Sequence, residues 1–223
     1  TEYIPGVRSV AIGMWAGVGS RDETPEMAGS AHFLEHLLFK GTHTRNALDI
    51  SSPIDAVGGE MNAFTSKEYT CYYVKVLDQD MALGVEILSD MLTNSIITPA
   101  DFKQEQKVIL EEIAKYEDDY ADNAHEAFNK AMFGDSDLGR PILGTVKTIK
   151  AAKRDSVWKF YKNHYKPNHL VISVAGAIDH AEVVAAVKKG FKHILGSNAL
   201  PSERRKSRKS FTPQSQIKVS PTD

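Results

Sequence analysis

The chain has few of the features by which proteins are cross-linked or placed in a membrane. It contains a single cysteine, Cys71, which excludes an internal disulfide and a zinc site built from cysteines within one copy. No apolar run approaches the roughly 18 residues of a membrane span, and residues 1–5 lack signal-peptide character. We therefore expect a soluble protein without a membrane partner. Any metal ion must be held by histidine and carboxylate side chains.

Strong charge of either sign is also absent. The formal net charge is −2, with 42% hydrophobic and 25% charged residues in a chain of 223. This balance gives no electrostatic reason to expect a nucleic acid or an anionic lipid surface as a partner. The composition is that of an ordinary globular protein, and the length allows one large domain or two small ones.

Hydrophobic periodicity predicts both strands and helices. The expected strands cover residues 9–16, 61–66, 69–77 and 169–176, and the expected helices cover 28–39, 48–57, 81–94, 99–116, 123–132, 155–165 and 180–191. The strand at 169–176 is expected to be buried. This order predicts an α+β fold in which helices cover one face of a largely antiparallel sheet.

The character of the sequence changes after Gly196. A basic run at 204–209 is typical of a solvated linker, and a strand-like stretch follows at 216–219. We expect one domain over residues 1–196, and a linker with the start of a further part over 197–223.

The strongest chemical signal is the run His32-Phe33-Leu34-Glu35-His36. Residues four apart on a helix point the same way, so the two imidazoles can converge on one ion. A catalytic zinc ion has about four ligands, one of them water, and therefore needs a further protein ligand here. A glutamate that does not bind the metal can act as a general base on that water. The alternative is a chance pair of histidines on an apolar helix, but this residue order is a known zinc-peptidase signature.

The long helix expected from residue 99 offers candidates for the third ligand. Phe102, Glu105, Ile109 and Glu112 follow one another at steps of three, four and three, which is one stripe of a helix. Glu111 is turned about 100° from Glu112 and is better interpreted as a solvated acid. An amphipathic helix with a salt-bridged seam would show the same stripe, and it is the histidine motif that favours the metal site.

Five stretches carry a resemblance to a known family: GVGSRDE (17–23), AHFLEHLLFKGT (31–42), MNAFTS (61–66), VILEEI (108–113) and LGRPILG (138–144). With them the chain resembles the N-terminal catalytic half of the pitrilysin/insulysin zinc metallopeptidases, also called inverzincins. The resemblance is closest to the branch of the β-like mitochondrial processing peptidases and bacterial processing proteases. It implies a metallohydrolase-like half of a two-half peptidase.

The resemblance also implies roles for individual residues. It makes His32, His36 and Glu112 the ligands of a Zn²⁺ ion, Glu35 the general base, and Glu105 a second catalytic acid that acts through a ligand. A further set, implied to bind substrate on an edge strand to which an extended peptide is added, comprises Asn62, Ala63, Phe64 and Thr65.

The function expected from this resemblance is that of a zinc-dependent endopeptidase, which hydrolyses peptides or presequences with a zinc-activated water. The implied partner is a second half, either beyond Asp223 or a homologous subunit of a homodimer or heterodimer. Two alternatives stay open: a non-catalytic structural or peptide-binding relative, and a half that is inactive until it is paired. The expected compartment is the bacterial cytoplasm, with the mitochondrial matrix as the alternative.

Overall fold

A computed structural model of the protein describes residues 1–194. Within them, five strands form one sheet in the order β1-β5-β2-β4-β3. The strands are β1 (Glu2–Tyr3), β2 (Ser9–Ala16), β3 (Glu60–Thr65), β4 (Thr70–Leu77) and β5 (Leu170–Gly176). β2 pairs antiparallel with both β4 and β5, β3 pairs antiparallel with β4, and the short β1 pairs parallel with β5. The predicted α+β fold with a largely antiparallel sheet is confirmed.

Residues 1–194 also contain α-helices, which outnumber the strands. They are α1 (Ser30–Leu38), α2 (Ala47–Ala56), α3 (Met81–Asn94), α4 (Pro99–Glu117), α5 (Tyr120–Phe133), α6 (Val146–Ala151), α7 (Arg154–His164) and α8 (His180–Gly190).

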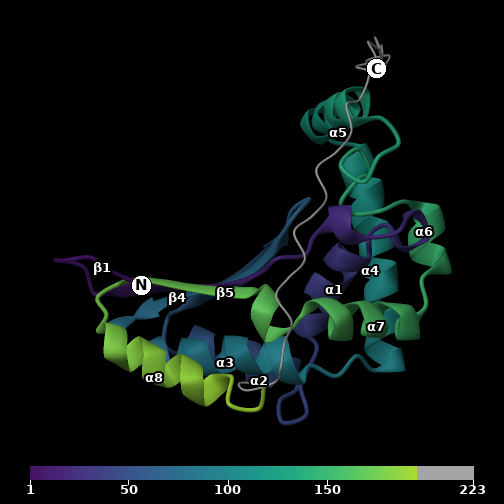
Figure 1. The fold of residues 1–223 in the computed structure, drawn as a ribbon. Helices are drawn as coiled ribbons and strands as arrows, with labels where there is room; N and C mark the ends of the chain where they lie inside the picture. The colour runs from purple at the N-terminus through teal and green to yellow at the C-terminus, as the bar shows by residue number, and fades with distance from the viewer. Residues whose placement is uncertain (195–223) are drawn as a thin grey trace.

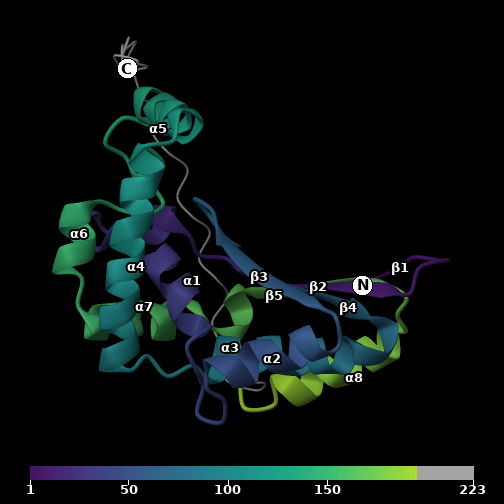
Figure 2. The ribbon, with the colours of Figure 1, turned by 180° about the vertical axis from the view of Figure 1, so that it is seen from behind.

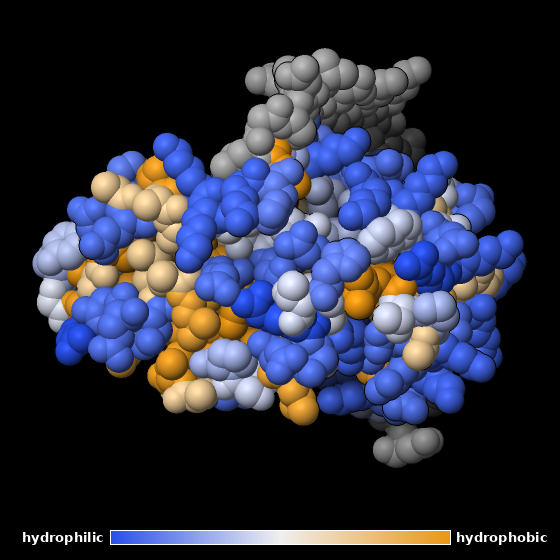
Figure 3. Space-filling model, turned by 90° about the horizontal axis from the view of Figure 1, so that it is seen from below, coloured by the Kyte–Doolittle hydropathy of each residue, from blue (hydrophilic) through white to orange (hydrophobic). Residues whose placement is uncertain are grey.

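Three of these helices cover one face of the sheet. α2, α3 and α8 lie beneath the strands in both ribbon views (Figure 1 and Figure 2). α3 contacts β2, β4 and α8, and so fills the centre of this layer. Viewed from below, the helical face is mostly hydrophilic with smaller apolar patches (Figure 3), as expected of helices that bury one stripe and expose the other.

The uncovered face of the sheet explains why one prediction was wrong. Residues 169–176 were expected to form a buried strand, but β5 alternates between the covered and the open face, and Val171 is 65% exposed. Successive side chains of a strand point to opposite faces, and within residues 1–194 helices cover one face of this sheet.

A second group of helices stands at the end of the sheet and carries α1 at its centre. α1 contacts α4, α7 and β3, and α6 packs on α4 (Figure 1). The rings of Phe33 on α1 and Phe102 on α4 are stacked, with centroids 4.5 Å apart and an interplanar angle of 20°. Both side chains belong to the hydrophobic core, which therefore runs continuously from the sheet to this helical group.

Most boundaries of the elements agree with the predicted ranges, and the exceptions have local causes. α4 starts as predicted, because Thr98 Oγ1 accepts the Asp101 N–H at 3.1 Å and Pro99 occupies the first turn. α5 begins earlier than predicted because Asp119 caps it. The short elements β1 and α6 were not predicted. The domain boundary at 196, the basic run at 204–209 and the strand expected at 216–219 lie outside the described residues.

Cys71 was expected to be a small buried apolar residue, and it is 2% exposed on β4. Burial raises the pKa of its thiol to about 11. No helix within residues 1–194 is both long enough and apolar enough to cross a bilayer.

The close approach of α3 to the sheet generates a prediction about Gly84. A Cβ atom there would lie 2.8 Å from Ile12 Cδ1 and 3.1 Å from Val74 Cγ1. We expect Gly84→Val to lower the free energy of unfolding by about 1–3 kcal/mol through overpacking, measured by urea denaturation. Ala82→Val, at an exposed position of the same helix, is the matched control. Equal effects of the two substitutions would contradict this account.

Candidate metal centre

α1 carries both histidines of the predicted motif on a helix that is almost wholly buried. Its apolar residues pack into the core, and His32 itself is 7% exposed, whereas His36 is half-buried. The two imidazole rings meet edge to face, with centroids 4.7 Å apart and an interplanar angle of 67°. The four-residue spacing thus has the expected effect of pointing both rings the same way.

α4 brings a carboxylate to these rings. Its buried face contains Phe102, Glu105 and Ile109, as the predicted stripe requires, and Glu112 lies half-buried at the edge of that face. Glu111, one position earlier, is exposed. The helix therefore directs Glu112 toward α1 and leaves Glu111 in solvent.

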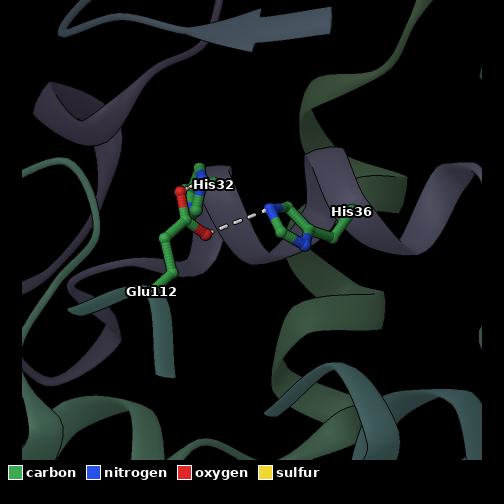
Figure 4. A group of neighbouring side chains, drawn as sticks. All are labelled: His32, His36 and Glu112. Carbon is green, nitrogen blue, oxygen red and sulfur yellow. Dashed lines mark ion pairs between the residues drawn. The ribbon is translucent and has the colours of Figure 1, made fainter. Parts of the chain in front are cut away.

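His32, His36 and Glu112 converge on one point, as Figure 4 shows. His32 Nε2 lies 3.6 Å from Glu112 Oε1, and His36 Nε2 lies 3.5 Å from Glu112 Oε2. One atom from each of the three side chains lies within 4.8 Å of the others. Each carboxylate oxygen thus faces a different histidine.

These separations fit a zinc ion better than direct hydrogen bonds. A distance of 3.5–3.6 Å is too long for an N–H···O hydrogen bond. Ligand atoms about 2.1 Å from a tetrahedral zinc ion lie about 3.4 Å from one another. Two imidazole nitrogens and one carboxylate are also a donor set typical of catalytic zinc, which leaves a fourth position for water.

The environment of His32 keeps its ring neutral. Burial, with a smaller contribution from the neighbouring His36, lowers the pKa of His32 to about 3. A neutral imidazole is the form that binds a metal. The other ring nitrogen, Nδ1, is buried without a hydrogen-bond partner among residues 1–194, so within this region no hydrogen bond to Nδ1 sets the orientation of the ring.

His36, in contrast, is held from behind by a buried acid. Glu105 is 2% exposed, and its Oε2 lies 3.2 Å from His36 Nδ1. This carboxylate favours a proton on Nδ1, which leaves the lone pair of Nε2 for a metal. Lys40 Nζ lies 2.7 Å from Glu105 Oε1 and balances the buried charge. The sequence prediction missed Lys40, because it follows the end of α1 at Leu38, where helical spacing no longer indicates a shared face.

The hydrogen-bond partner of Glu35 is a residue of strand β3 and not a residue of α4. Thr65 Oγ1, on β3, donates a hydrogen bond of 2.5 Å to Glu35 Oε2. Burial raises the pKa of Glu35, while the Thr65 hydroxyl and His36 lower it. Thr65 was predicted to bind substrate, and the structure brings its hydroxyl to the acid expected to act as general base.

The four residues predicted to bind substrate all lie on an edge strand. β3 is the last strand of the sheet and pairs with β4 alone within residues 1–194. Asn62 and Phe64 point to the open face, whereas Ala63 and Thr65 are half-buried. The Asn62 side chain accepts the Ala63 N–H at 2.8 Å, so one donor along this strand is already engaged.

A second buried acid, Glu23, lies at the start of α1, and the sequence prediction gave it no role. Glu23 is 5% exposed, and it accepts the Gly29 N–H on Oε2 at 2.9 Å and the Ala31 N–H on Oε1 at 2.7 Å. Burial raises the pKa of its carboxyl to about 8, whereas the two backbone donors and Arg140 lower it. Local capping signals could not reveal Glu23, because such caps lie immediately before a helix.

Comparison with protein families gives the affiliation. Residues 1–146 match the profile described as "Insulinase (Peptidase family M16)". The chain belongs to peptidase family M16. Residues 151–223 match a second profile of this family, "Peptidase M16 inactive domain". The resemblance to the pitrilysin/insulysin group is thereby confirmed.

Two curated relatives with similar sequences are bacterial, and their names begin with "Uncharacterized zinc protease". One from Streptomyces coelicolor is 57% identical over 86% of this chain and 42% of the relative. Another, YmxG from Bacillus subtilis, is 48% identical over 85% of this chain and 46% of the relative. The chain thus spans about half the length of these curated relatives.

Solved structures share the fold of this M16 chain. A protease from Helicobacter pylori superposes with a TM-score of 0.83 at 23% identity, over 89% of this chain and 49% of that one. The first half of the periplasmic protease PqqL from Escherichia coli gives a TM-score of 0.79 at 24% identity, over 89% and 44%. The fold is therefore that of one half of an M16 protease.

The buried Glu23 carboxyl predicts a pH dependence of stability. Folding raises the pKa of this carboxyl from 4.5 to about 8. The protonated carboxyl therefore contributes to the free energy of unfolding in full below about pH 4.5, and this contribution is lost as the pH rises through about 8. We expect the free energy of unfolding of the metal-free wild type to fall relative to that of Glu23→Gln between about pH 5 and pH 9. Urea denaturation with a chelator measures it, and a constant difference between the two proteins would refute the assignment.

Proposed function

We propose that this chain is the zinc-binding half of a zinc-dependent endopeptidase. The observation that carries the proposal is the convergence of His32, His36 and Glu112, in which each histidine Nε2 lies 3.5–3.6 Å from a Glu112 oxygen. Membership of peptidase family M16 and the names of the relatives support the same chemistry.

In this proposal the two histidine Nε2 atoms and the Glu112 carboxylate hold Zn²⁺. When bound, the ion would act as a Lewis acid that polarises a carbonyl group and lowers the pKa of water, so that water can give up a proton to a base and attack at neutral pH. Glu105 binds no metal. Its contact with His36 Nδ1 keeps that ring in the orientation and tautomer that a ligand needs.

Glu35 is the proposed general base. It is adjacent to His36 on α1, and its raised pKa suits a group that takes a proton and later passes it to the leaving amine. The Thr65 hydroxyl, which now bonds to Glu35 Oε2, fixes the carboxylate at the end of β3. A hydrogen bond therefore connects Glu35, the proposed base, to β3, the proposed substrate strand.

The proposed substrate is an extended peptide, which adds to β3 as a further strand. An edge strand offers backbone N–H and C=O groups to such a peptide, and alternate side chains then reach the two faces of the sheet. The bond between Asn62 and the Ala63 N–H has to open for full pairing. This contact makes Asn62 a residue that competes with the substrate for one donor.

A second half is part of the proposal because curated relatives are about twice as long as this chain. We propose that this half, as a covalent extension or as a homologous subunit, closes over the open face of the sheet. The chain alone would then bind zinc but cleave little until it is paired. Location in the bacterial cytoplasm stays a prediction.

The ligand assignment predicts a difference between two adjacent acids. We expect Glu112→Gln to weaken zinc binding by more than about 100-fold, because the loss of a group behind a ligand already costs about 10- to 100-fold. Glu111→Gln, which removes the same charge from an exposed position of α4, should leave the affinity unchanged. Competition with a zinc chelator measures both, and equal losses would rule out Glu112 as the specific ligand.

The role of Glu35 predicts a separation of binding from chemistry. We expect Glu35→Gln to lower peptide cleavage by about 100- to 10,000-fold while zinc stays bound at wild-type affinity. The assay uses the chain together with its second half, with a quenched fluorescent peptide as substrate. Cleavage at the wild-type rate by the variant would show that another group is the base.

A further inference from the structure

The first turn of α1 is unusual in how it is capped. Its N-cap residue is Gly29, which has a left-handed backbone (φ 94°) and no side chain to accept a hydrogen bond. The free N–H groups at a helix start need acceptors, which the N-cap side chain normally provides. Here the acceptor comes from outside the helix, because the Glu23 carboxylate binds the N–H groups of Gly29 and Ala31.

The two bonds use both oxygens of the Glu23 carboxyl, one for each N–H group. A carboxylate accepts on both oxygens, and a protonated carboxyl keeps a lone pair on each oxygen and can accept both N–H groups as well. The ionised form, which predominates above the pKa of about 8, also interacts favourably with the positive end of the helix dipole.

Glu23 is itself fixed by two other parts of the chain. The turn before it is tied to the β3–β4 connection, because the Arg21 N–H donates to the Lys67 carbonyl at 2.8 Å. Arg140 Nη2 donates to the Glu23 carbonyl at 2.6 Å, and Lys67 Nζ donates to the Arg140 carbonyl at 2.5 Å. Glu23 thus connects the end of the edge strand to the start of the metal helix.

The loop that carries Arg140 also approaches the backbone at the start of α1 closely. A Cβ atom at Gly29 would lie 2.6 Å from the Leu143 carbonyl oxygen, and one at Gly144 would lie 2.4 Å from the Ala28 carbonyl oxygen. Both glycines allow a backbone contact that no larger residue could make without a shift. The first turn of α1 is consequently held by Glu23 on one side and by residues 143–144 on the other.

This support matters because of the difference between the two histidines. His36 has Glu105 behind its Nδ1, but His32 Nδ1 has no hydrogen-bond partner among the described residues. With no hydrogen bond behind it, the His32 ring depends on packing and on the backbone of α1, and Glu23 binds the N–H of the residue just before it, Ala31.

We propose that Glu23 is a positioning residue for the metal centre, which holds the first turn of α1 so that His32 faces Glu112. The inference rests on the proposed zinc site and adds to it a carboxylate that touches neither metal nor substrate. Its action on the metal passes through the two backbone N–H groups and the helix start.

The test compares Glu23→Gln with wild type in zinc competition with a chelator at pH 8.5, where the carboxylate is ionised. The variant places an N–H group against a backbone N–H, and we expect its zinc affinity to fall by about 10- to 100-fold. Glu26→Gln removes a fully exposed acid three residues along and should bind zinc like the wild type. The visible spectrum of the Co²⁺-loaded protein should change in Glu23→Gln and not in the control.

A second readout separates positioning from general stability. If Glu23 only stabilised the fold, a loss of zinc affinity would accompany a loss of stability. We expect the metal-free Glu23→Gln protein at pH 8.5 to be at least as stable as the wild type toward urea and still to bind zinc more weakly. Wild-type affinity in Glu23→Gln, or a weakened affinity accompanied by a matching loss of stability, would overturn the proposal.

Two further outcomes are distinguishable. If the wild type itself binds no zinc, the proposed function fails. If Glu23→Gln leaves the zinc affinity unchanged, this inference alone fails.

If the Gln variant does not fold, Glu23→Asp provides the test, because a side chain shorter by one methylene cannot keep both N–H bonds. Its zinc affinity should then fall below that of Glu26→Asp, and equal affinities of the two Asp variants would count against Glu23.

Discussion

The packing of α1 against α4 is the contact on which the candidate centre depends. Each helix carries part of the proposed ligand set, which is complete only where the two helices meet. The stacked rings of Phe33 and Phe102 fix how far one helix is shifted along the other, an interaction of about 0.5–1.5 kcal/mol beyond simple burial. A shift by one helical residue, about 1.5 Å, would carry the carboxylate away from the imidazoles. Precise apolar packing thus sets the geometry of a polar site.

Three acids around this contact have similar chemistry and different surroundings. Glu112 is half-buried and faces two imidazoles, Glu105 is fully buried between His36 and Lys40, and Glu35 bonds to a strand hydroxyl. A carboxylate's role follows from what it contacts, because partners and burial decide its charge and orientation. The different proposed roles of Glu112 as ligand, Glu105 as the acid behind a ligand and Glu35 as base therefore follow from their positions.

Sequence periodicity was informative wherever the decisive contacts are local. The four-residue spacing of the histidines and the stripe on α4 indicated which side chains share a face, and Glu111 is exposed as expected. Contacts between distant segments could not be read in this way. Glu23 reaches α1 across a loop, Arg140 reaches Glu23 from 117 positions away, and the open face of β5 depends on which helices the fold places beneath the sheet. Each of these is a product of tertiary structure.

The position of β5 bears on how this architecture can be divided. β5 pairs with β1 on one side and β2 on the other, yet it lies in the segment matched by the second family profile, which begins at residue 151. The boundary between the two profiles is therefore not a boundary between folding units. Gene fusion, domain exchange or truncation at that point would strip a central strand from its sheet. The unit that evolution or a designer can move as one piece has to include both segments.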